Sequence, residues 1–390
     1  MVYCTFAGSM DQIYLDYNST TPVDPRVLEA MLPFFSEKFG NAASHTHRWG
    51  WSAAAVVDKA RQEVAELIHA GPEEIIFTSG ATEAINLAMR GVMDVYSVKG
   101  KHLLVASTEH KAVLDTAADL VRTGAEVEYL PVNREGLIDT AELEKKIRPE
   151  TVLVCVMMAN NETGTIQPVE EISRICNEKK TLFLCDTTQA IGKTRVDVQE
   201  LGLHLCTISA HKFYGPKGIG ALYVRRKDPR VKLAAAITGG GHERGLRSGT
   251  LNVPGIVGMG AAATLARGYQ WDYGMHTSRW RTILEQQLTS EGRGFINGSI
   301  RSRLPNTTSI TFPGVRSEAL IKIIPDIGIS MGSACSSALP KPSHVLKAMG
   351  LTDEEIYSSI RISLGKKTTE EEVRSAIFRI GGALDDLRGN

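Results

Sequence analysis

The sequence has no excess of either charge and no long hydrophobic run. Its 44 lysines and arginines balance 44 aspartates and glutamates, so the chain as a whole lacks the basic footprint of a nucleic-acid-binding protein, and charge gives no reason to expect a membrane surface. No window approaches the roughly 20 apolar residues that span a membrane. The first dozen residues lack a basic start followed by an apolar core, so they do not read as a signal peptide. We expect neither a direct nucleic-acid partner nor a membrane partner.

Cysteines are few and scattered, and they form no paired motif. They are Cys4, Cys155, Cys176, Cys185, Cys206 and Cys335. There is no C-x-x-C pair and no zinc-finger spacing, and the pair His45 and His47 lacks a third ligand, so no metal site is expected. Reduced thiols are typical of the cytoplasm, which is the location we expect.

The apolar pattern predicts an α/β fold. Short continuous apolar runs, such as 103–106, 152–159, 182–185 and 205–208, alternate with helical patterns, as in sheets buried on both faces. This alternation predicts a mainly parallel sheet. After about Gly260 the pattern becomes largely helical, so we expect a large domain over 18–260 and a smaller α+β domain formed by 1–17 and 261–390. The strand expected at 12–22 should lie near this smaller domain.

Polar residues follow several of the expected strands. Ligands of open α/β sheets bind beyond the carboxyl ends of the strands. Taken singly, each of these residues has an ordinary explanation as a helix cap, a turn former or a surface group. Together they offer a helix N-terminus for a phosphate, an aromatic ring, amides, a carboxylate and an amine. The residues are Ala81, Thr82, His110, Asn161, Asp186, Gln189, Ser209, His211 and Lys212.

This set matches the needs of pyridoxal 5'-phosphate. Lys212 would form the Schiff base with its aldehyde, and Asp186 would keep its pyridine nitrogen protonated so that the ring acts as an electron sink. His110 would stack on the ring, and Gln189 would hydrogen-bond the ring oxygen. The phosphate would be held by the helix N-terminus at Ala81 and by the side chains of Thr82, Ser209 and His211.

Eight segments together resemble the cysteine desulfurases, in the housekeeping and nitrogen-fixation branch of the class V aminotransferase superfamily. They are "LDYNSTTPVDPRV", "IFTSGATEAINLAM", "EHKAVLD", "ANNETGTIQPVEEI", "DTTQAIGK", "SAHKFYGPKGIGALYVRR", "GGGHERGLRSGTLNVPGIVGMGAA" and "GSACSSALPKPSHVLKAMG". The resemblance runs from about Ile13 to Leu387. It implies the pyridoxal-phosphate-dependent transferase fold (fold type I) and a homodimer in which Thr250 reaches the phosphate bound by the other subunit.

The resemblance also implies a second chemical centre. Cys335 lies in a loop rich in serine, glycine and proline, where an exposed thiolate would attack the sulfur of L-cysteine. Arg361 would bind the substrate carboxylate, Asn18 and Asn161 would complete the substrate pocket, and Lys212 and His110 would move protons. The products would be L-alanine and a Cys335 persulfide. An acceptor protein, a scaffold or a carrier, would then take the sulfur for iron–sulfur cluster assembly, thionucleoside synthesis or DNA phosphorothioation.

Other functions remain open at this point. One alternative is a selenocysteine lyase or another class V aminotransferase, for which replacing Cys335 should spare selenocysteine chemistry more than desulfuration. The other is a non-enzymatic sulfur-relay scaffold with a vestigial cofactor site. A visible absorbance band that is lost with Lys212→Ala would argue against the scaffold.

Overall fold

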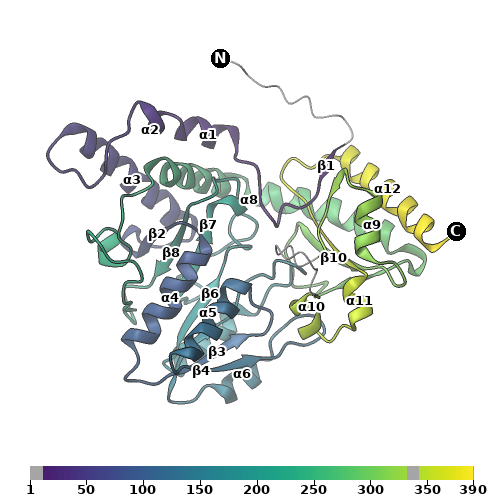
Figure 1. Cartoon of the computed structure of the whole chain (residues 1–390), viewed down its shortest axis with the longest axis horizontal. Helices are drawn as coiled ribbons and strands as arrows, with labels where there is room; N and C mark the ends of the chain where they lie inside the picture. Colours follow the sequence, from purple (N-terminus) through teal and green to yellow (C-terminus); the bar gives the residue numbers. More distant parts are fainter. Residues whose placement is uncertain (1–11, 332–341, 390) are drawn as a thin grey trace.

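A seven-stranded sheet forms the centre of the molecule. The computed structural model describes residues 12–331 and 342–389 (Figure 1). The strand order is β2-β8-β7-β6-β5-β3-β4, and β8 alone runs antiparallel to its neighbours. The strands are β2 (Ile75–Thr78), β3 (His102–Ala106), β4 (Glu126–Leu130), β5 (Thr151–Cys155), β6 (Leu182–Asp186), β7 (Leu205–Ser209) and β8 (Gly220–Val224). The predicted α/β class with a mainly parallel sheet is confirmed.

Helices cover both faces of this sheet. Every residue of its strands is buried, except in the edge strand β4, and this explains the continuous apolar runs. One face packs against α4 (Ala81–Val95) and α5 (Lys111–Arg122). The other face packs against α3 (Arg48–Leu67), α7 (Val169–Glu178) and the start of α8 (Val253–Leu288). The remaining helices of this part are α1 (Pro25–Met31), α2 (Pro33–Ser36) and α6 (Thr140–Lys146).

A second, smaller group of elements lies to the right of the sheet in Figure 1. Its strands are β9 (Phe295–Asn297), β10 (Thr307–Thr311) and β12 (Ser359–Ser363), which form an antiparallel sheet, and β1 (Ile13–Tyr14), which pairs with β11 (Ile327–Gly328). Its helices are α9 (Ser317–Ile323), α10 (His344–Ala348), α11 (Asp353–Tyr357) and α12 (Glu370–Arg388). The N-terminal strand therefore lies beside the C-terminal elements, as expected from the sequence.

The long helix α8 joins the two groups. Val253 and Ile256 near its start belong to the core of the central sheet, whereas Trp280 and Leu284 near its end belong to the core of the smaller group. The boundary predicted after residue 260 falls inside this helix, and the division of the chain into 18–260 and 1–17 with 261–390 stays a prediction. Among the described residues, no helix is long and apolar enough to cross a membrane.

Candidate active site

A cavity of about 530 Å³ opens at the carboxyl ends of the parallel strands. The parallel strands end at one edge of the sheet, so the polar residues that follow them meet there. Eleven of the thirteen residues predicted from the sequence line this cavity: Asn18, Ala81, Thr82, His110, Asn161, Asp186, Gln189, Ser209, His211, Lys212 and Arg361. Thr250 lies outside it, and Cys335 lies outside the described residues.

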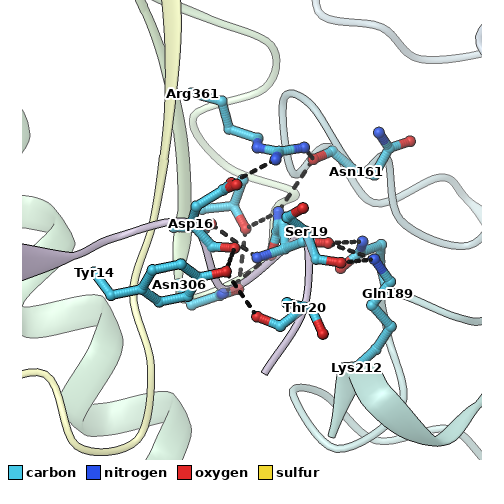
Figure 2. Close-up of polar contacts among 12 residues, drawn as sticks. Tyr14, Asp16, Ser19, Thr20, Asn161, Gln189, Lys212, Asn306 and Arg361 are labelled. Carbon is cyan, nitrogen blue, oxygen red and sulfur yellow. Dashed lines mark hydrogen bonds and ion pairs between the residues drawn. The ribbon is translucent and has the colours of Figure 1, made fainter. Parts of the chain in front are cut away.

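Lys212 follows β7 and points at the segment that joins β1 to α1. Its Nζ donates to the backbone oxygens of Asn18 at 2.7 Å and of Ser19 at 2.6 Å (Figure 2). Burial, followed by the charge of Arg361, lowers the pKa of this amine from 10.5 to about 8, although Asp16 and Asp186 oppose this. About a tenth of Lys212 is therefore an uncharged nucleophile at pH 7, and the fraction grows as the pH approaches 8.

Asp186 ends β6, the strand next to β7. Its Oδ1 accepts from Thr207 Oγ1 at 2.8 Å and from the backbone N–H of Thr188 at 3.0 Å. Both bonds reach the same oxygen, which leaves Oδ2 without a hydrogen bond in the described part of the chain. The carboxylate is buried, lines the cavity and is held in one orientation.

His110 is the N-cap of α5, at the end of the segment that joins β3 to α5. Its Nδ1 accepts from the backbone N–H of Ala112 at 3.1 Å, so the neutral ring carries its proton on Nε2. Burial, followed by the nearby charge of Lys212, lowers the pKa of His110, although Asp186 opposes this. The imidazole is therefore uncharged near neutral pH.

The N-terminus of α4 forms part of the cavity wall, with Ala81 and Thr82 among the lining residues. The capping residue Gly80 supplies no side-chain cap, so the first N–H groups of α4 are left for another partner. Gly220 at the start of β8 allows the close approach of this turn, because a Cβ there would lie 2.6 Å from Gly80 Cα. Ser209 Oγ lies near the same turn, 3.9 Å from the place of a Cβ on Gly80. Backbone donors and a hydroxyl thus gather at one end of the cavity.

Arg361, on β12, lines another part of the cavity. Its Nη2 donates to Asp16 Oδ1 at 2.6 Å and its Nη1 to the backbone oxygen of Asn161 at 3.0 Å (Figure 2). The side chain is only 3% exposed, and its Nε has no hydrogen-bond partner among residues 12–331 and 342–389. A buried guanidinium with an unsatisfied N–H is a site for an anionic ligand.

Hydrogen bonds to neighbouring residues fix the side chains of Asn18, Gln189 and His211. Gln189 Nε2 donates to the backbone oxygen of Asn18 at 2.9 Å, and Asn18 Nδ2 donates to Thr307 Oγ1 at 2.9 Å. His211 Nδ1 pairs with Thr20 Oγ1 at 3.1 Å. Burial, aided by the charge of Lys212, lowers the pKa of His211 to about 4.

Thr250 and the cysteines lie elsewhere. Thr250 lines a depression of about 190 Å³ that shares Ser79 and Gly218 with the main cavity. The described cysteines, Cys155, Cys176, Cys185 and Cys206, are all buried in the core of the central sheet. Burial raises the pKa of each of these thiols, to about 12 for Cys176 and Cys206, so none is a reactive thiolate.

Several residues in or beside the cavity were not predicted from the sequence. Asp16 pairs with Arg361 at the edge of the cavity. Thr188 lines the cavity, and its hydroxyl has no hydrogen-bond partner among the described residues. His344 also lines it, and its Nε2 donates to the backbone oxygen of Glu109 at 2.9 Å. Lys193 lies behind the wall, bonded to Asn18 and Gln189. Lys193 stands in the mixed polar and apolar stretch "DTTQAIGKTRVD", where no local pattern marks it as buried. Within the described residues, no cluster of His, Cys, Asp and Glu could hold a metal ion.

Comparisons with known proteins agree with this arrangement. The family model "Aminotransferase class-V" matches residues 13–375. The cysteine desulfurase IscS of Anaeromyxobacter dehalogenans (strain 2CP-C) is 52% identical over 377 residues, which cover 96% of this chain and 93% of that protein. A solved structure titled "NIFS-LIKE PROTEIN" is 39% identical, with a TM-score of 0.89, and covers 97% of this chain and 100% of that one.

A third similar protein was solved with a small molecule bound. The structure titled "SspA in complex with cysteine" is 36% identical, with a TM-score of 0.80, and the match covers 90% of this chain and 98% of that one. These similarities extend over nearly the whole chain, and the family model matches far more than half of it. The chain therefore belongs to the class V aminotransferase family and, within that family, to the cysteine desulfurases.

Proposed function

We propose that the cavity binds pyridoxal 5'-phosphate and that the enzyme uses it to transfer sulfur from L-cysteine to Cys335. The observation that carries this proposal is one cavity in which the amine of Lys212, the carboxylate of Asp186, the uncapped start of α4 and the guanidinium of Arg361 meet. The net reaction converts L-cysteine and the thiol of Cys335 into L-alanine and a Cys335 persulfide. When bound, the cofactor supplies an electron sink that weakens bonds at the substrate carbon atoms.

The donor set of the cavity fits this cofactor. The N–H groups of α4 at Ala81 and Thr82 and the hydroxyl of Ser209 suit the phosphate, with His211 beside them. Asp186 Oδ2 is available for a protonated ring nitrogen. We assign covalent attachment of the aldehyde to Lys212 and ring stacking to His110.

Thr250 has a separate role in this proposal. It lies outside the cavity of its own chain, and we propose that it reaches the phosphate held by a second copy in a homodimer. Exposed apolar side chains on the segment from α1 to α3 support a dimer, because they are a surface that water solvates poorly. They are Leu28, Leu32, Phe35, Phe39, Trp49 and Trp51.

Protons are moved by Lys212 and His110. With a pKa of about 8, Lys212 accepts a proton from the substrate and returns it without a large energy cost at neutral pH. His110 carries its proton on Nε2, which is the nitrogen free to act as an acid or base, since Nδ1 caps α5. Arg361 orients the substrate through its carboxylate, with Asn18 and Asn161 beside it.

Cys335 is the proposed nucleophile. The described cysteines are buried, with raised thiol pKa values, and are unsuited to attack on sulfur. The described residues on either side of 332–341 are attached to the cavity: Ser330 exchanges backbone hydrogen bonds with Arg361, and Ser343 Oγ donates to Glu162 at 2.5 Å. This supports a thiol on that segment that serves the same cavity.

The persulfide sulfur then passes to an acceptor protein. The similarity to IscS proteins favours iron–sulfur cluster assembly as the destination. Thionucleoside synthesis and DNA phosphorothioation use the same persulfide chemistry, so the acceptor is defined here only as a protein thiol or scaffold. The free, reduced cysteines favour a cytoplasmic location.

Borohydride trapping tests the cofactor assignment directly. The protein loaded with pyridoxal phosphate should become yellow, and reduction should fix the chromophore on the peptide that contains Lys212. Lys111 and Lys217 also line the cavity and serve as internal controls. A label on either of them, or on Lys193, would contradict the assignment.

A further inference from the structure

Lys193 is a buried amine one layer behind the cavity wall. It lies in the connection that follows β6 and is 4% exposed. Its Nζ donates to Asn18 Oδ1 at 2.9 Å and to Gln189 Oε1 at 2.5 Å. Among the described residues, no carboxylate compensates its charge. A lysine buried in this way is costly unless its amine does something that an apolar side chain cannot do.

The contacts of Lys193 match an uncharged amine. Such an amine has two N–H groups, and Lys193 has two acceptors, both of them side-chain amide oxygens. Burial holds the pKa of Lys193 well below its usual value, and the charges of Lys212 and Arg361 lower it further. Lys193 therefore acts as a double donor to these two amide oxygens, and burial favours its neutral form.

These two bonds determine which way the neighbouring amides face. Because Gln189 Oε1 accepts from Lys193, its N–H₂ group is left to donate to the Asn18 backbone oxygen at 2.9 Å. Lys212 Nζ donates to that same oxygen at 2.7 Å. The Gln189 N–H₂ group and the Lys212 amine therefore point toward the same backbone oxygen of Asn18. Asn18 Oδ1 is also held by Asn306 Nδ2 at 3.2 Å, which links the wall to the smaller group of elements.

We propose that Lys193 is a positioning residue that fixes the amides of Asn18 and Gln189, so that Gln189 presents its N–H₂ group, and not its oxygen, to the phenolic oxygen of bound pyridoxal phosphate. This inference rests on the cofactor proposed above. An amide turned the other way would place a lone pair against a negative oxygen. Lys193 touches neither cofactor nor substrate in this scheme, and it acts through Gln189.

The consequence is a shift in an optical titration. The phenolic oxygen lies beside the nitrogen through which Lys212 holds the cofactor, and a donor on that oxygen favours loss of the neighbouring proton. Removing the donor should therefore raise the pH at which the visible band of the bound cofactor titrates. One charge-assisted hydrogen bond corresponds to an upward shift of about one to two pH units.

The experiment titrates the visible band of the loaded enzyme, wild type and Lys193→Met, without substrate. The variant should titrate about one to two units higher, as should Gln189→Ala, and the double variant should show no further shift, because both changes remove the same donor. Lys322→Met, an exposed lysine on α9, is the control and should titrate as the wild type does. If Lys193→Met does not fold, Lys193→Gln takes its place, since its shorter side chain cannot reach both acceptors.

The outcomes separate this inference from the function on which it rests. If the wild type does not bind the cofactor on Lys212, the proposed function fails. If the wild type binds it and the folded Lys193 variant titrates at the wild-type pH, only the role of Lys193 is overturned. Additive shifts in the double variant would also overturn it, because Lys193 would then act independently of Gln189.

Discussion

Replacing Arg361 with glutamine tests how the enzyme recognises the carboxylate of L-cysteine. Arg361 is 3% exposed, and its position is fixed by Asp16 at 2.6 Å and by the Asn161 oxygen at 3.0 Å. Its Nε has no partner in the part of the chain that the structure describes, so we expect this N–H to serve a ligand. Arg361→Gln removes the charge and the fork of donors while keeping a polar side chain of smaller size.

The expected loss follows from one charge-assisted hydrogen bond. Such a bond contributes about 1.5–3 kcal/mol, and each 1.36 kcal/mol is a factor of ten, so affinity for L-cysteine should fall about 10- to 150-fold. The change also leaves Asp16 without its partner, which lowers stability. Arg361→Lys keeps a positive charge beside Asp16 but lacks the two-pronged geometry, so it should lose affinity with a smaller loss of stability.

The assay compares L-cysteine with cysteamine, which lacks the carboxylate. Binding is followed by the change in the cofactor spectrum, at equal cofactor occupancy. The wild type should prefer L-cysteine, and Arg361→Gln should abolish that preference while leaving cysteamine affinity nearly unchanged. Arg374→Gln, which removes an exposed arginine on α12, should behave as the wild type. Equal losses for both ligands would refute the role of Arg361 in binding the carboxylate.

Three further changes test other parts of the site. Asp186→Asn should still bind the cofactor but lose about 100- to 1,000-fold in kcat, because a neutral amide cannot stabilise a protonated ring nitrogen; unchanged turnover at full occupancy would exclude that role. The rate of cofactor uptake by the cofactor-free protein should rise with pH with a midpoint near pH 8 and level off about one unit higher, because half of Lys212 is neutral at its lowered pKa of about 8; a rise that continues toward pH 10.5 would indicate an unperturbed lysine. Gly220→Ala would place a Cβ 2.5 Å from the Ile208 oxygen and 2.6 Å from Gly80 Cα, so it should cost about 1–3 kcal/mol and weaken cofactor binding, whereas Gly268→Ala, with open space around it, should not.

The sequence alone predicted the site residues that stand at the ends of expected strands or at the start of an expected helix. Asp186 ends β6, and Lys212 comes soon after β7. Because parallel strands end at one edge of a sheet, the meeting of these residues could be inferred from the strands along the chain. The same reasoning placed Thr82, at a helix start, and His110, after an expected strand, beside them. Arg361 lies on a strand of the smaller group, and only the family resemblance indicated it.

The remaining features depend on contacts between distant segments. Asn18 and Lys193 are 175 residues apart in sequence, and no local pattern brings them together. The antiparallel direction of β8 follows from the short connection between Ser209 and Gly220, which leaves too few residues for a parallel crossover. That connection contains Lys212 and other residues of the site. Its residue types therefore did not indicate that the next strand runs antiparallel.

The measurement that tests the central claim most directly is sulfur transfer by Cys335→Ser. The loaded variant keeps Lys212, Asp186 and Arg361, so it should bind pyridoxal phosphate and respond spectroscopically to L-cysteine as the wild type does. The wild type should form one equivalent of protein persulfide for each L-alanine released in a single turnover, with the added sulfur on the peptide that contains Cys335. The variant should form neither product at a normal rate, because a hydroxyl is a poor nucleophile toward sulfur. Release of L-alanine by Cys335→Ser at the wild-type rate would contradict the account.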